Sequence, residues 1–299
     1  MRQTGRSPTR RALLHLTLIV VAALYLLPLI WMVSTSTKTE RQAIEQPTAL
    51  LPTPIADIPR QIRDNYLGTN NDDGTVEARG VLNDPVIDFP LYLKNTLVVA
   101  ILSVSGMVIS TSLVAYGFSR VRWRFRGAVF AVVLATMMIP FPVIMGPMFI
   151  LFRDLGWIGT LKPLWVPAWF ASGYNIFLLR QFFMTIPREL DEAAKIDGCS
   201  HLGVLWRIIL PNAKPALAVV ALFHFMFVWN DFLGPLIFLV DRDDFTLALG
   251  LQLYQAQSGE VPWNLLMAAS SMVVLPVLLA FVLAQRTFVE GLSSTGLKE

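Results

Sequence analysis

The sequence predicts an all-α integral membrane protein with six transmembrane helices and both termini in the cytoplasm. Of the 299 residues, 55% are hydrophobic and only 15% are Asp, Glu, Lys or Arg, whereas roughly a quarter of residues are charged in soluble domains. The apolar residues also form blocks of about 20, the helical length that crosses a hydrocarbon core of about 30 Å. Backbone groups find no water inside a bilayer, so these blocks must be helices unless they close into a barrel, and the alternating strands of a barrel are absent from the sequence.

Six blocks qualify as spans, and we expect them at about 12–33, 96–118, 127–151, 164–179, 215–240 and 263–284. The third contains Pro140 and Pro142, and the fourth is short and weakly apolar. Gly106 and Ser110 in the second are spaced for close helix packing. A basic stretch precedes the first block, as in a cleaved secretory signal. Its apolar run is longer than a signal core, so we expect a retained helix.

The basic residues predict the orientation, because Lys and Arg in short loops beside the spans tend to stay in the cytoplasm. Arginines precede the first span and fill the turn between the second and third, namely Arg2, Arg6, Arg10, Arg11, Arg120, Arg122, Arg124 and Arg126. Acidic residues gather in the first and last outer loops, namely Asp72, Asp73, Glu77, Asp84, Asp88, Asp241, Asp243 and Asp244. Topology accounts for the basic residues, so the net charge of +3 gives no reason to expect a nucleic-acid partner.

The outer loops differ in length and composition. The first, 34–93, is rich in Pro, Asn, Asp and Gly, and this content predicts turns with little regular structure. It is either a solvated connector or a docking site for an extracytoplasmic partner. The last, 241–262, is long and acidic enough to contact a binding protein.

The inner segment 187–214 predicts a helix, a glycine turn and a second short helix at the cytoplasmic surface. One face of the first helix carries residues at i, i+3, i+4 and i+7, namely Leu190, Ala193, Ala194 and Asp197. Acidic residues in its first turn complement the helix dipole, and Gly198 is placed to end the helix. The second helix is expected from about Ser200 to Ile209, before Pro211.

This segment contains a spaced motif. It reads Glu192-Ala193-Ala194, three residues, Gly198, nine residues, then Ile208-Ile209-Leu210-Pro211. The pattern resembles the EAA loop of the membrane subunits of ATP-binding-cassette (ABC) importers, and every fixed position of that loop is matched. Two adjacent alanines let another protein approach the helix closely, and glycine permits a sharp reversal. Alternatively, the segment is an ordinary amphipathic cytoplasmic hairpin without a docking role.

The resemblance implies a type I ABC importer permease fold. In that family the motif helix sits in a cleft of the ATPase subunit, so the resemblance assigns ATPase coupling to Glu192, Ala193, Ala194, Asp197 and Gly198. Further segments are similar to the maltose-type carbohydrate permeases, namely Asn65-Tyr66, Asn95-Thr96, Ala115-Tyr116 with Arg120, Ile139-Pro140, Trp229-Asn230-Asp231 and Gln285-Arg286.

The family resemblance also implies the partners and the location. It predicts a permease for a sugar or oligosaccharide in a bacterial cytoplasmic (inner) membrane, surrounded by lipid. The expected partners are a second permease subunit, two ABC ATPase subunits and an extracytoplasmic sugar-binding protein. The ATPase subunits would bind ATP and Mg, and no cofactor is expected in this chain.

Other function classes lack their motifs. No lysine directly follows a glycine, so the nucleotide-binding motif G-x-x-x-x-G-K-[ST] is absent and the ATPase must be another chain. Three histidines, one cysteine and no H-E-x-x-H predict neither a catalytic nor a metal site, so the chain is not expected to be an enzyme. The rival is an ion-coupled secondary transporter acting without an ATPase. Such a transporter usually pairs charges within the membrane, and Asp231 has no basic counterpart in its helix.

The fifth span carries the candidate substrate-pathway residues Trp229, Asn230 and Asp231. At 1.5 Å per residue, Asn230 and Asp231 lie about 23 Å from Pro215, in the outer half of the helix. Amide and carboxylate groups suit sugar hydroxyls, and Trp229 could stack on a pyranose ring. Alternatively, these residues contact the second permease subunit or cap a helix broken before Gly234. We expect His224 to be a packed polar residue rather than a proton relay.

Overall fold

The computed structural model describes residues 8–70, 76–256 and 261–295. These residues are mostly helical, with one antiparallel pair of short strands, β1 (Thr69–Asn70) and β2 (Val76–Ala78). The chain divides into two compact units. The first unit comprises Met1–Phe89 and Leu251–Val274, and the second comprises Pro90–Gly250 and Leu275–Glu299. Four charged residues used above to predict orientation lie outside the described residues, namely Arg2, Arg6, Asp72 and Asp73.

Three helices are long and apolar enough to cross a bilayer. They are Arg11–Ser36 within α1 (Pro8–Ser36), α4 (Phe89–Ser119), and Trp263–Gln285 within α15 (Trp263–Thr295). Two bent helix pairs also reach this length if each pair counts as one span. The described residues therefore contain three to five candidate spans, and a sixth span and the cytoplasmic position of the termini stay predictions.

The third predicted span is broken rather than continuous. Its two halves, α5 (Arg126–Thr136) and α6 (Phe141–Asp154), meet at an angle of 97°. Pro140 has extended backbone angles before α6, and Pro142 occupies its first turn. Proline lacks the N–H that a helix interior needs and disfavours helical geometry in the preceding residue, so the helix ends before the pair and restarts after it.

The fourth and fifth predicted spans are interrupted as well. The fourth contains α7 (Lys162–Trp165), the 3-10 helix η2 (Val166–Phe170) and α8 (Gly173–Thr185). Ser172 caps α8 by accepting the Asn175 N–H at 3.4 Å. The fifth ends as α12 (Lys214–Trp229) and resumes as α13 (Leu233–Phe238). The expectation of one continuous helix over 164–179 was therefore wrong, and for 215–240 the alternative of a helix broken before Gly234 is confirmed. Each segment turns where side chains can satisfy the freed backbone groups.

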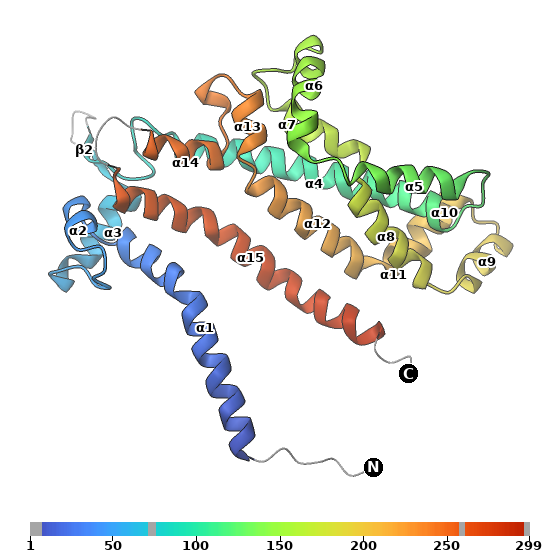
Figure 1. Cartoon of the computed structure of the whole chain (residues 1–299), viewed down its shortest axis with the longest axis horizontal. Coiled ribbons are helices and arrows are strands. Elements are labelled where there is room, and N and C mark those ends of the chain that lie inside the picture. The colour runs from blue at the N-terminus through green and yellow to red at the C-terminus, as the bar shows by residue number, and fades with distance from the viewer. Residues whose placement is uncertain (1–7, 71–75, 257–260, 296–299) are drawn as a thin grey trace. The chain divides into compact units, whose positions relative to one another are not determined.

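The second unit is built around α4. Within this unit α8 packs against α5 and α12, and α4 contacts α12 through the hydrogen bond between Ser103 and His224 (helices labelled in Figure 1). The predicted close packing at Gly106 is confirmed, since a Cβ there would overlap the Trp169 ring. The Ser110 hydroxyl donates to the Ala168 carbonyl at 3.1 Å. Small residues thus let α4 and the η2 segment touch.

The N-terminal part of α4 also orders the start of the last outer loop. The Asn95 amide nitrogen donates to the Asp243 carbonyl at 2.7 Å and to the Phe245 carbonyl at 3.0 Å. The Thr96 hydroxyl accepts the Leu247 N–H at 2.8 Å. These bonds fix the 3-10 helix η4 (Arg242–Asp244) and the first turn of α14 (Leu247–Gln255) against α4.

In the first unit, the loop predicted to have little regular structure is instead organised. It contains α2 (Glu40–Glu45), the 3-10 helix η1 (Ile55–Asp57), α3 (Ile58–Tyr66) and the strand pair. Buried Asn65 on α3 donates to the carbonyls of Ser36 at 2.8 Å and Lys38 at 2.7 Å, and it accepts from Asn264 at 2.8 Å. One amide therefore joins the end of α1, α3 and the start of α15.

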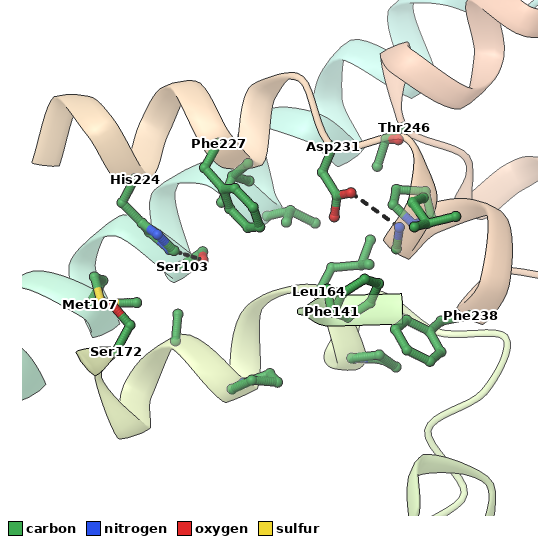
Figure 2. Close-up of a pocket in the computed structure, with 18 of the residues that line it drawn as sticks. Ser103, Met107, Phe141, Leu164, Ser172, His224, Phe227, Asp231, Phe238 and Thr246 are labelled. Atoms are coloured by element: carbon green, nitrogen blue, oxygen red, sulfur yellow. Dashed lines mark hydrogen bonds between the residues drawn. The ribbon is translucent and has the colours of Figure 1, made fainter. Parts of the chain in front are cut away.

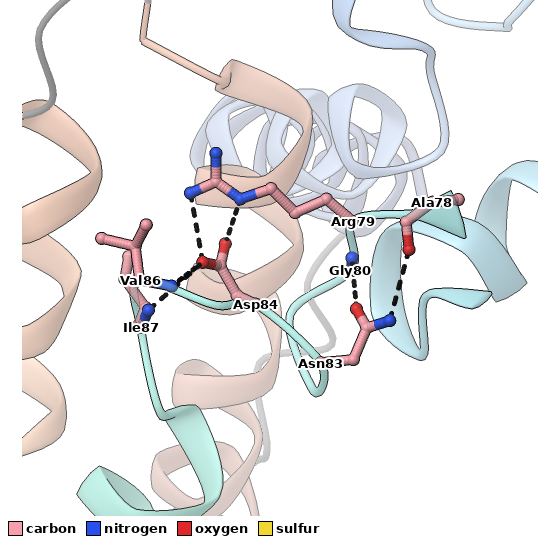
Figure 3. A network of polar contacts seen from close by, with 7 residues as sticks. All are labelled: Ala78, Arg79, Gly80, Asn83, Asp84, Val86 and Ile87. Atoms are coloured by element: carbon pink, nitrogen blue, oxygen red, sulfur yellow. Dashed lines mark hydrogen bonds and ion pairs between the residues drawn. The ribbon is translucent and has the colours of Figure 1, made fainter. Parts of the chain in front are cut away.

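A second polar centre in the same unit is the carboxylate of Asp84 (Figure 3). Its side chain has no exposed area and pairs with the Arg79 guanidinium at 2.7 Å. The same carboxylate accepts the N–H of Val86 at 2.8 Å and of Ile87 at 3.2 Å. The chain between the hairpin and α4 is thus folded around one buried charge.

We predict that Asp84→Ala opens this segment. The change removes the acceptor of two amides and the carboxylate that pairs with Arg79, and breaking a buried pair costs about 3 kcal/mol. Hydrogen exchange at Val86 and Ile87 should accelerate about 100-fold, since each factor of ten corresponds to about 1.4 kcal/mol. Asp84→Asn, which keeps an acceptor oxygen, should have a smaller effect.

The matched control is Asp154→Ala, because the Arg153–Asp154 pair is 61% exposed on both sides and such pairs contribute little. Unchanged exchange at Val86 and Ile87 in Asp84→Ala would contradict the central role of the carboxylate.

Candidate functional site

The motif segment forms the predicted helix, turn and helix. Its first helix, α9 (Glu189–Ile196), starts with three acidic residues. Gly198 has φ +83°, a left-handed conformation that glycine adopts without steric cost. The Cys199 N–H donates to the Ala194 carbonyl at 2.9 Å and closes the turn. The chain is thereby reversed within three residues of the helix end.

The second helix of this segment is less regular than predicted. It consists of α10 (His201–Val204), the π-helix η3 (Leu205–Ile209) and α11 (Leu210–Asn212). Ser200 caps α10 by accepting the Gly203 N–H at 3.2 Å. Pro211 lies inside α11 rather than ending the helix, and the chain then bends by 81° into α12.

The motif residues lie mostly on the surface of α9. Glu192, Ala193 and Asp197 are exposed, whereas Ala194 is buried. Ile196, with 87% of its area exposed, is an apolar side chain without cover in this chain. The face that carries Glu192 and Ala193 is therefore open to a partner. The opposite face, with buried Asp191 and Ala194, packs against other helices of the second unit.

Arg120 holds that opposite face in place. It follows the last residue of α4 directly, and its guanidinium pairs with Asp191 on α9 at 3.3 Å. The side chains are 3% and 10% exposed. The guanidinium also donates to the Phe183 carbonyl and, at 2.7 Å, to the Ile186 carbonyl, at the end of α8. From the sequence, Arg120 was assigned to topology and to a segment shared with the carbohydrate permeases, but its contact with Asp191 was not predicted.

A buried apolar cluster includes Phe183 and Ile186, whose carbonyls Arg120 binds. It combines residues of α4, η2, α8, α9, α10, η3 and α12 and of the segments between them, namely Met107, Ala115, Tyr116, Ala168, Leu179, Phe183, Ile186, Ala194, Val204, Leu205, Ile209, Ala213, Ala216 and Val220. Tyr116, one turn before Arg120, also approaches His201 on α10, with 3.4 Å between the hydroxyl and Nδ1. The motif segment is thus packed on the C-terminal end of α4 (Figure 1).

A cavity of about 700 Å³ lies in the second unit, lined by residues of α4, α6, α7, α8, α12 and α13. Its walls are mostly apolar, with the aromatic rings of Phe141, Phe227 and Phe238 (Figure 2). The Ser103 hydroxyl and His224 Nε2, 2.7 Å apart, form a polar pair on one side. Packing of His224 as a partnered polar residue agrees with the sequence prediction.

The three pathway candidates occupy different environments. Asp231 lines the cavity, and its carboxylate accepts the Gly234 N–H at 3.1 Å, which caps α13 (Figure 2). Trp229 is only 1% exposed and packs against Phe225, with ring centroids 5.2 Å apart. Asn230 is exposed and donates to the Met226 carbonyl of its own helix at 2.7 Å. Of the three, Asp231 alone is among the residues that line the cavity.

The described residues offer no metal centre, since no group of three or more His, Cys, Asp or Glu could hold an ion there. The sites that remain are an exposed helix on a glycine turn and a cavity between helices of a membrane chain. Together they are features expected of a membrane transport subunit with a surface for another protein.

Comparison with known proteins agrees with this class. The family model for the inner membrane component of binding-protein-dependent transport systems matches residues 106–293. The trehalose/maltose transport system permease protein MalG of Thermococcus litoralis is 34% identical over 97% of each chain. The sn-glycerol-3-phosphate transport system permease protein UgpE of Agrobacterium fabrum is 30% identical over 96% of this chain and 98% of that one.

The fold is also found among solved structures. A chain of a bacterial ABC transporter involved in the import of the acidic polysaccharide alginate aligns with a TM-score of 0.76 at 23% identity, covering 96% of this chain and 99% of that one. The protein belongs to the family of inner membrane components of binding-protein-dependent transport systems, the permease subunits of ABC importers.

We predict that the Asp231 carboxylate stabilises the chain as a helix cap rather than through its charge. Asp231→Asn keeps an oxygen that can accept the Gly234 N–H, so the thermal stability in detergent should stay near wild type. Asp231→Ala removes the acceptor and should cost about 1 kcal/mol. Asn230→Ala, beside it, serves as the control and should change stability by less than about 0.5 kcal/mol. Equal destabilisation by Asn and Ala at position 231 would assign the effect to charge.

Proposed function

We propose that this chain is the permease subunit of an importer that carries a sugar or oligosaccharide across the cytoplasmic membrane, powered by a separate ATPase. The observation that carries the proposal is the exposed surface of α9 with Glu192 and Ala193. This helix is followed by Gly198 in a left-handed conformation, in a chain that belongs to this family. The substrate class is supported by the names of relatives, which include permeases for trehalose and maltose and for arabinooligosaccharides.

The energy source lies in another chain under this proposal. The sequence has no G-x-x-x-x-G-K-[ST] motif, so ATP and Mg would bind to two separate ATPase subunits. These two subunits would close on each other when ATP is bound. The small side chain of Ala193 would let an ATPase subunit approach the backbone of α9 closely. Exposed Ile196 and Leu190 offer apolar area that a docked partner would cover. Asp197 and Gly198 would set the angle at which the helix is presented.

Two further partners complete the complex. The side chains of α1 between Arg11 and Ile30 are exposed within this chain, except half-buried Leu29, and an apolar helix of this kind is covered by lipid or by a second permease subunit. An external sugar-binding protein would deliver the substrate. A solved alginate importer in complex with a pentasaccharide-bound periplasmic protein, which shares this fold with a TM-score of 0.59, supports that arrangement.

The cavity is the proposed part of the substrate pathway in this subunit. Its volume of about 700 Å³ falls within the range of about 300–1,000 Å³ that is typical of ligand pockets. Ser103, His224 and Asp231 supply hydroxyl, imidazole and carboxylate groups that can bond sugar hydroxyls, and Phe141 and Phe227 supply apolar faces. Alternating access would expose this cavity to each side in turn when the ATPase subunits close and push α9.

A secondary transporter is the alternative function. It would need a titratable site within the membrane that takes up a coupling ion. Asp231 is the carboxylate at the cavity, and its oxygen already accepts the Gly234 N–H. The exposed motif helix has no role in such a transporter, so the importer is favoured.

We predict that an affinity-tagged chain purified in mild detergent carries an ATPase subunit with it. Glu192→Lys reverses the charge on the exposed face of α9, and Gly198→Pro is incompatible with φ +83° because proline fixes φ near −65°. Either change should reduce the co-purified ATPase about tenfold or more, as quantified by ATP hydrolysis per mole of permease.

Asp154→Lys is the control, since it places the same new charge on an exposed position of α6. A wild-type chain that purifies alone and transports sugar without ATP would contradict the proposal and favour the secondary transporter.

A further inference from the structure

Arg120, which directly follows α4, joins that helix to α8 and α9 through the hydrogen bonds of its guanidinium. Its own N–H donates to the Tyr116 carbonyl at 2.9 Å, so its backbone continues α4. One guanidinium nitrogen, Nη1, donates to Asp191 on α9, and the other, Nη2, donates to the carbonyls at the C-terminal end of α8. Cations at this end also complement the dipole of α8.

We propose that the Arg120–Asp191 ion pair is the mechanical link by which movement of α9 reaches the helices that line the cavity. This inference rests on the proposed function. It assigns to Arg120 and Asp191 a positioning role that lies outside the motif, because neither residue belongs to the Glu192 to Gly198 pattern.

The linked helices also carry cavity residues, near the middle of α4 and at the start of α8. Ser103 and Met107 line the cavity from α4, and Asn175 lines it from the first turn of α8. Ser103 precedes Arg120 by 17 positions in the same chain, which corresponds to about 25 Å of helix at 1.5 Å per residue. A displacement applied at Arg120 is therefore transmitted along two stiff helices to the cavity wall.

Few other side chains of α9 contact the rest of the second unit. Within α9 the buried side chains are Asp191 and Ala194. Ala194 contributes a small apolar contact to the cluster, which resists compression but not sliding. The ion pair, by contrast, is directional, because the planar guanidinium presents its donors in a fixed geometry. Asp191 is thus the contact on α9 that can both push and pull on α4.

The ion pair leaves two buried polar atoms without a hydrogen-bond partner, namely Arg120 Nε and Asp191 Oδ1. The planar fork of Arg120 uses Nη1 for Asp191 and Nη2 for the two carbonyls at the end of α8. Because an unsatisfied buried polar atom costs free energy, a movement of α9 that gave Asp191 Oδ1 a partner would be favoured.

The test uses the complete transporter in proteoliposomes, with ATPase subunits, second permease, binding protein and maltose as the probe sugar. Asp191→Asn keeps the shape of the side chain and removes its charge. We expect the ATPase to co-purify within about twofold of wild type, while the sugar transported per ATP hydrolysed falls about tenfold or more. Arg120→Lys keeps the charge and loses the planar fork, and it should give the same loss of coupling.

A double variant and a control separate coupling from folding. If the two residues act as one link, Arg120→Lys with Asp191→Asn should lose no more coupling than either change alone, because neighbours that share an interaction are not additive. Asp154→Asn, in the exposed Arg153–Asp154 pair, should leave coupling unchanged.

The outcomes distinguish the two proposals. A wild-type complex without an ATPase contradicts the proposed function itself. A complex that keeps its ATPase, and in which Asp191→Asn transports as much sugar per ATP as wild type, overturns the link alone. Loss of ATPase binding in Asp191→Asn and Arg120→Lys also overturns it, because the pair would then serve docking or folding. Additive losses in the double variant would show that the two residues act separately.

Discussion

The requirement that every backbone polar group be satisfied away from water governs this structure. A membrane chain meets it with continuous helices, and α4 does so over 31 residues. Where helices break, a side chain or a neighbouring backbone must replace the lost bonds. Ser172 performs this task before α8 and Asp231 before α13. Residues at both breaks line the cavity, so the cavity lies where the helices are interrupted.

Buried polar side chains, rather than apolar packing alone, determine how segments distant in sequence meet within each unit. In the first unit Asn65 joins the ends of two helices, and Asp84 gathers the backbone that leads into α4. In the second unit Arg120 does the same for α8 and α9. A single polar atom that is left without its partner costs more than a lost apolar contact, so these side chains specify one arrangement among several that would bury similar apolar area.

Local sequence patterns were enough to predict the membrane class, the long helices and the glycine turn after α9. Length and apolarity identify α1, α4 and α15, and Gly198 is readable because few residues tolerate positive φ. The organisation of 34–93 was missed in part because Asn65 bonds to Asn264, 199 positions further along the chain. The Arg120–Asp191 ion pair was missed because its two residues are 71 positions apart. Periodicity contains no information about such pairings.

The chain has a single cysteine, and it lies at the turn that closes α9. Cys199 is partly exposed and follows the glycine at the end of the motif helix. A thiol-reactive fluorophore or spin label would therefore attach to the unaltered protein at one position only. That position is adjacent to the surface that Glu192 and Ala193 present, so the natural sequence already contains a spectroscopic reporter for the arrival and departure of whatever docks there.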